Sequence, residues 1–180
     1  MKIKSLYLAI LMLGLSSTSV LAADGTLKFM GNIGTSSCMV SNGDNAEINV
    51  PMGTVPVERL ENDINGPAVG FAITLQGCKI GTYYLVLDGT SPSGQENVLA
   101  LDEAGGDGVA QGVGIKVTDI ADNPVTLSKQ LDTVHDASVN ITKENESGTF
   151  YLKAHYYAFD TDNLTAGVAN ATATFTIIQK

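Results

Sequence analysis

Short apolar runs with a period of two constrain this chain more than any other feature of its sequence. In 70–75 every second residue is large and apolar, and weaker forms of the same alternation recur in 113–117 and 171–177. Side chains spaced in this way lie on one face of an extended strand. No segment has a sustained helical period, so the sequence predicts an all-β chain.

Turn signals separate the predicted strands. The strand candidates are 70–75, 83–87, 98–101, 113–117, 125–127, 149–159 and 171–177. The dipeptides and tripeptides between them are typical of turns: Asn42-Gly43, Asn65-Gly66-Pro67, Ser93-Gly94, Asp107-Gly108 and Ser147-Gly148. Several short strands joined by such turns indicate a β-sandwich or a barrel.

The first residues of the chain are typical of an export signal. Two lysines precede an apolar run over 6–15, and small residues follow at 20–22. The run is shorter than the roughly 20 residues that a membrane span needs. We therefore predict a signal peptide over 1–22, with cleavage after Ala23 as the alternative, followed by one domain.

The charge of the chain argues against nucleic acid as a partner. The sequence has 10 Lys and Arg against 19 Asp and Glu, a formal net charge of −9. Removal of the signal peptide with its two lysines leaves 8 − 19 = −11. Contact with phosphates needs a surface of Lys and Arg. Solubility of an exported domain explains the acidity more simply than an acidic docking patch does.

Two cysteines, Cys38 and Cys78, lie 40 residues apart. In an exported chain a disulfide is the expected state of such a pair. Reactive thiols are the alternative, but the sequence has no Cys-X-X-Cys spacing and no nearby His or Arg to activate them.

The apolar arm ahead of the first cysteine is unusual. Leu27, Phe29, Gly31 and Ile33 fall on one face of a predicted strand. Glycine is rare inside a strand unless another backbone approaches closely. The arm is either an ordinary first strand of its own sheet or a segment inserted into a partner. The chain also ends on an apolar strand, which invites a strand from another chain.

No residue pattern predicts catalysis, a cofactor or a metal. His135 and His155 are the only histidines, and neither has a Cys or His at ligand spacing. The pairs Tyr83-Tyr84 and Tyr156-Tyr157 would suit a sugar-binding surface, but packing within strands is the simpler interpretation.

Several motifs occur in a characteristic order and spacing. They are Phe29-X-Gly31-X-Ile33, Cys38 seven residues after Gly31, Phe71-X-Ile73-X-Leu75 leading into Cys78, residues 97–101, residues 112–115, and residues 166–175. Through these motifs the whole mature chain resembles the chaperone–usher pilus subunits, close to the type 1 fimbrial major pilins.

The resemblance implies an incomplete immunoglobulin-like sandwich of six strands, whose seventh strand is supplied in trans. An N-terminal donor-strand arm over 23–34 would precede a pilin domain over 35–180. The protein would be a structural subunit of a surface fimbria that supports cell adhesion. Its partners would be neighbouring subunits, a periplasmic pilus chaperone and an outer-membrane usher, and its route would run through the periplasm to the cell surface.

The resemblance also implies roles for individual residues. The donor residues would be Leu27, Phe29, Gly31 and Ile33, and Gly31 would occupy a position without room for a side chain. The acceptor and chaperone edge would include Phe175, Ile177 and Gln179. The bridge Cys38–Cys78 would join the first two strands.

One position departs from the family pattern. The family usually has a tyrosine next to last, where this chain has Gln179. A minor tip or adaptor subunit with a binding role is therefore the alternative function, and the copy number in fibres would discriminate the two. A secreted enzyme on the same fold has no support beyond fold class.

Overall fold

A computed structural model describes residues 38–41, 47–127, 130–134 and 136–180 of this chain. The predicted signal peptide and the predicted arm, with Leu27, Phe29, Gly31 and Ile33, lie outside the described residues. So does His135.

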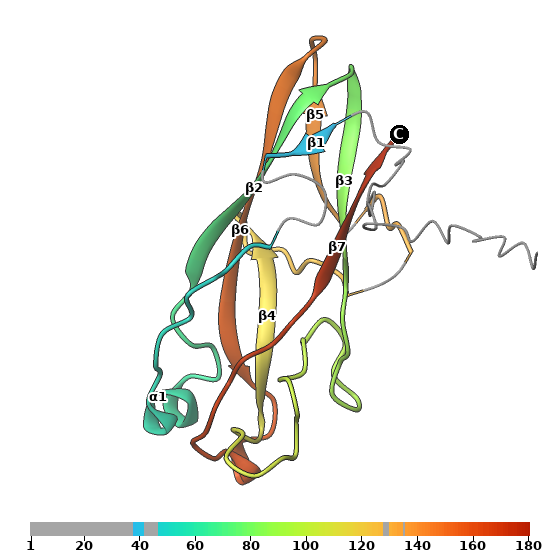
Figure 1. The fold of residues 1–180 in the computed structure, drawn as a ribbon. Helices are drawn as coiled ribbons and strands as arrows, with labels where there is room; N and C mark the ends of the chain where they lie inside the picture. The colour runs from blue at the N-terminus through green and yellow to red at the C-terminus, as the bar shows by residue number, and fades with distance from the viewer. Residues whose placement is uncertain (1–37, 42–46, 128–129, 135) are drawn as a thin grey trace, which may run out of the picture. The chain divides into compact units, whose positions relative to one another are not determined.

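The described residues form two antiparallel sheets (Figure 1). The elements are β1 (Met39–Val40), α1 (Val57–Asn62), β2 (Val69–Cys78), β3 (Gly81–Asp88), β4 (Val113–Asp119), β5 (Ala137–Ile141), β6 (Glu146–Ala158), the 3-10 helix η1 (Thr161–Asn163) and β7 (Thr174–Gln179). One sheet has the strand order β1-β2-β6-β4, and the other has β5-β3-β7. The predicted all-β class is confirmed.

The number of strands differs from the six that the resemblance implies. The described residues contain seven, of which β1 has two residues and β5 has five. Neither β5 nor α1 is among the elements that alternation predicts. Both are short, and β5 mixes apolar with polar residues, so neither carries enough of a period to be recognised.

The two sheets enclose the core between them. Along β6 buried and accessible residues alternate, with Phe150, Leu152 and Ala154 pointing inward. Phe150 and Leu152 pack in one core cluster with Leu75 of β2 and Leu85 of β3, which have no exposed surface. Because successive side chains of a strand point to opposite faces, the period of two places one apolar face of each sheet in the core.

A bulge near the end of β2 changes the direction in which its last residue points. Ile73 and Leu75 face the core, and strict alternation would turn Cys78 outward. The register with β6 shifts between Leu75 and Cys78, and Gly77 has a φ of +64°, which favours glycine. The extra residue brings Cys78 into the core, where it is fully buried.

Candidate functional site

The last strand, β7, lies at the edge of its sheet. Among the described residues its one strand neighbour is β3, and Figure 1 shows β7 in red running along β3 toward the C-terminus. An edge strand presents backbone N–H and C=O groups on its outer side, where a further strand can pair.

Three residues of β7 lie directly opposite three residues of β3. The pairs are Phe175–Leu87, Ile177–Leu85 and Gln179–Tyr83. Directly opposed residues share one face of a sheet. The three β3 residues are 6, 0 and 0 % exposed, whereas their three β7 neighbours are only half-buried. The apolar face of β7 is therefore incompletely covered.

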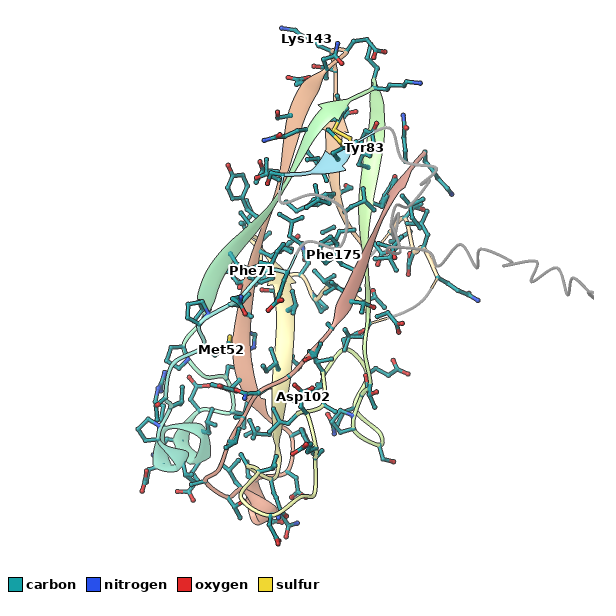
Figure 2. The ribbon with its side chains drawn as sticks, viewed as in Figure 1. Met52, Phe71, Tyr83, Asp102, Lys143 and Phe175 are labelled. Atoms are coloured by element: carbon teal, nitrogen blue, oxygen red, sulfur yellow. A yellow bond between two sulfur atoms is a disulfide. The ribbon has the colours of Figure 1, made fainter. Side chains whose placement is uncertain are left out.

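The inner face of the opposite sheet, β1-β2-β6-β4, is also incompletely covered at Phe71. Phe71 points inward from β2 and pairs with Leu152, which is buried, yet Phe71 itself is half-buried. The neighbouring strand β1 pairs only with Leu75 and Gln76. Figure 2 shows Phe71 and Phe175 in the interval between β2 and β7.

We name this half-buried apolar region the open flank. Its members share partial burial and contact with the core clusters: Val40, Ile48, Val50, Met52, Phe71, Phe175 and Ile177. They come from segments on both sides of the sandwich. A side chain added from outside could be buried against them.

Gln179 lies against the beginning of β3. Its Nε2 donates a hydrogen bond to the carbonyl of Ile80, at 3.3 Å. Gly81 leaves room for this side chain, because a Cβ there would lie 2.9 Å from Gln179 Nε2. The C-terminal residue is held too, since Lys180 N donates to Thr82 O at 2.9 Å.

Cys38 and Cys78 form a disulfide, as expected. Cys38 directly precedes β1 and Cys78 ends β2, so the bond fastens β1 to its neighbour. The core-facing position of Cys78 depends on the bulge at Gly77, which the sequence alone did not predict. A glycine directly before a cysteine was the available signal.

The other sequence candidates that the structure describes do not form a chemical site. His155 lies on the outward face of β6, where burial and then the charge of Lys116 lower its pKa. Within the described ranges no cluster of His, Cys, Asp or Glu could hold a metal ion. Nor does any described helix have the length and apolar character needed to cross a bilayer.

The tyrosine pairs are split between the two faces of their strands. Tyr83 and Tyr156 are buried, and their hydroxyls donate hydrogen bonds to the carbonyls of Lys79 and Ala169. Tyr84 and Tyr157 face the other way. Neither pair forms a joint surface, in agreement with packing within strands.

Comparison with known proteins shows to which protein family this chain belongs. The family model of the fimbrial proteins matches residues 27–179. A type 1 fimbrial protein subunit of Serratia marcescens is 38 % identical over the full length of both chains. The type 1 fimbrial protein A chain of Escherichia coli K12 is 34 % identical over 98 % of each.

Solved structures share the fold at low identity. A chain of a chaperone–usher pilus, from a study of rod uncoiling, has a TM-score of 0.65 at 18 % identity and covers 91 % of this chain and 100 % of its own length. The P pilus rod subunit PapA has a TM-score of 0.62 at 19 % identity, covering 80 % and 99 %. With the sequence matches, they show that this chain belongs to the fimbrial protein family, as a structural subunit of a surface fimbria.

Proposed function

We propose that this protein polymerises by exchange of a strand between copies, with β7 as the acceptor edge and residues 27–33 as the donor. The half-burial of Phe175 and Ile177 beside fully buried Leu85 is the observation that carries the proposal. An added strand beside β7 would pair the backbone groups on its outer side and cover the open flank.

The donor side of the proposal rests on the sequence of the arm. Leu27, Phe29 and Ile33 would enter the open flank, and Gly31 would take a position too close to another backbone for a side chain. Burial of the three large side chains is worth roughly 5–9 kcal/mol, at about 1.5–3 kcal/mol each. Release of the strand would require opening of the sandwich, which makes the polymer kinetically stable.

The proposal extends to export and to partners. Residues 1–22 would direct export, and 23–34 would then form the free arm of the pilin domain over 35–180. Before polymerisation the open flank is an aggregation hazard. A periplasmic chaperone would cover it, and an outer-membrane usher would be the place where the next subunit's arm replaces the chaperone.

Thermal unfolding of two versions of the protein tests the acceptor role. One version contains residues 35–180, and the other carries residues 24–34 on a short linker after Lys180. At about 2–4 °C per kcal/mol, the appended arm should raise the midpoint by roughly 10–35 °C. Equal midpoints would mean that the sandwich is already complete.

A substitution in the arm tests the donor role. Gly31→Leu should remove most of the gain in the appended version and should stop fibre growth by the full chain, while chaperone binding persists. The matched control is Asn32→Leu, which adds a similar side chain on the opposite face of the predicted strand. Normal fibres from Gly31→Leu would contradict the donor role.

A further inference from the structure

The outward face of β6 carries two tyrosines, a lysine and a histidine at successive positions. They are Tyr151, Lys153, His155 and Tyr157. On the adjacent β2 the residues opposite Lys153 and Tyr151 are small, Gly70 and Ala72. Small neighbours leave the long side chains of β6 accessible, and Tyr151 is 62 % exposed.

Positive charge on this face is only partly compensated. Lys153 Nζ lies 2.5 Å from the carboxylate of Asp122. Lys116 lies opposite His155 in the β4–β6 register, and its Nζ is 3.2 Å from the ring centroid of Tyr157. Among the described residues Lys116 has no carboxylate partner. In a chain with a net charge of −9, an uncompensated lysine stacked on an aromatic ring is a ready contact for an anionic group.

A hollow with both polar and apolar lining continues this face at one end. Tyr151 lines it together with Ile120, which is 70 % exposed, and with Pro124, Asp119 and Asp136. Exposed apolar side chains that gather with aromatic residues are typical of protein interfaces. We name the joint surface of Lys116, Ile120, Tyr151, Lys153, His155 and Tyr157 the β6 face.

A complementary surface lies elsewhere on the same molecule. The loops 102–112 and 160–168 lie together, because Val109 bridges to Val168 and Gln111 to Thr165. Figure 1 shows both loops at the end of the domain away from the C-terminus.

Carboxylates and one exposed apolar side chain define this surface. Its acids are Glu103, Asp107 and Asp162, whose carboxylates accept no hydrogen bond from the described residues, and Val168 is 58 % exposed. The sequence has no Lys or Arg from 88 to 112 or from 154 to 179. We name Glu103, Asp107, Asp162 and Val168 the acidic pole.

We propose that the β6 face of one copy binds the acidic pole of another copy in the fibre. The inference rests on the proposed polymerisation and adds a second contact to strand exchange. Carboxylates would meet the ammonium group of Lys116 and accept a hydrogen bond from the imidazole of His155, and Val168 would meet Ile120 and Tyr151. Because the two surfaces differ, the contact is heterologous and propagates along an open assembly.

The net negative charge of the protein also restricts where a second copy can bind. Two copies with net negative charge repel each other at long range, so only a surface where cations gather can accept the acidic pole. Salt screens exposed charges within about 10 Å at 0.1 M. We therefore expect the contact to loosen as ionic strength rises, while strands that complete a core stay in place.

Cross-linking within fibres of the full-length protein tests the contact. Fibres are assembled from equal parts of unlabelled and isotope-labelled subunits and treated with a carbodiimide, which joins a lysine amine to a carboxylate in contact. We expect peptides that link Lys116 of one isotope form to Glu103, Asp107 or Asp162 of the other. Lys116→Glu and Asp107→Lys should each weaken the contact, and their combination should restore the cross-link with the partners exchanged.

Lys143→Glu is the matched control, because it reverses one charge at the turn between β5 and β6, away from both surfaces (Figure 2). It should leave the Lys116 cross-links unchanged. Fibres that form normally without cross-links from Lys116 to the acidic pole would overturn this proposal alone, and absence of fibres would overturn the proposed polymerisation as well. If isolated subunits instead bind an acidic oligosaccharide, lose it in Lys116→Glu and show no such cross-links, the β6 face is a glycan site and the proposal is wrong.

Discussion

Strands β3 and β7 are neighbours with similar apolar residues on the same face, yet they differ in burial. Leu85 is fully buried, whereas Ile177 directly beside it is half-buried. Strand β3 has a strand on each side, and β7 has one among the described residues. The comparison teaches that burial at the edge depends on what lies beyond β7 and not on the residue types of β7.

A large effect on the subunit alone should come from loss of the disulfide that fastens β1, a strand of the sheet opposite β7. Replacing both Cys38 and Cys78 by Ala releases β1, which is two residues long. Loop entropy for the 40-residue separation gives about 4 kcal/mol of lost stability. The midpoint of thermal unfolding should fall by roughly 8–16 °C, at about 2–4 °C per kcal/mol. An unchanged midpoint would show that β1 contributes little.

Truncation of the paired residues tests the comparison directly. Leu85→Ala should cost about 2–5 kcal/mol, because it leaves a cavity in the closed core. Ile177→Ala should cost about 1–2 kcal/mol in the subunit alone, since its side chain is only partly removed from water. Denaturant unfolding measures both, and appending residues 24–34 should raise the cost of Ile177→Ala toward that of Leu85→Ala. Equal costs without the arm would contradict an open edge.

A smaller effect should follow from release of the segment that leads into β7. Asp102 accepts hydrogen bonds from Thr172 N at 3.0 Å and from Thr172 Oγ1 at 2.9 Å. Asp102→Ala should cost about 1 kcal/mol and increase hydrogen exchange at the start of β7. The control Asp107→Ala removes a carboxylate without a hydrogen bond from the described residues, so its cost should stay below about 0.5 kcal/mol. Equal costs would mean that Asp102 does not hold the segment.

The smallest effect should appear at the turn between β5 and β6. Glu146 accepts hydrogen bonds from the backbone N–H groups of Thr142 and Lys143, both at 3.0 Å, and these bonds lower its pKa. A lowered folded-state pKa stabilises the turn above the unfolded-state pKa, and this contribution is lost as the pH falls through the folded-state value.

Amide protection at Thr142 and Lys143 should therefore decrease in acid, and Glu146→Gln should abolish this dependence. Glu144→Gln is the control at the same turn, because no hydrogen bond to its side chain occurs among the described residues. The amide protection factors of the edge strand β7 should not change as Glu146 becomes protonated, because the effect is confined to the turn. A pH dependence that survives in Glu146→Gln would contradict this assignment.

Much of the fold could be predicted because strand-forming alternation is local. The predicted strands 70–75, 83–87, 113–117 and 149–159 correspond to β2, β3, β4 and β6. The predicted strand 171–177 begins later, at Thr174, because the backbone N–H of Thr172 donates its hydrogen bond to the side chain of Asp102 and not to a neighbouring strand. No local pattern reveals a contact across 70 residues.

The candidate site was predicted in part. The disulfide followed from two cysteines in an exported chain, and the last apolar strand indicated an edge. The inward turn of Cys78 required the bulge at Gly77, and the contact of Gln179 with Ile80 required the close approach at Gly81. The donor arm lies outside the described residues, so its role stays a prediction.

The sequence by itself determined the all-β class, the faces of the main strands and the cysteine pair, because these depend on spacing along the chain. Only the tertiary structure decided which of two neighbouring apolar rows is closed and which is open. Leu85 and Ile177 are both large apolar residues of predicted strands, and their burial differs because β3 has a strand on each side, whereas among the described residues β7 has one. The β6 face and the acidic pole arise in the same way, from side chains that only the packing of strands and loops brings together.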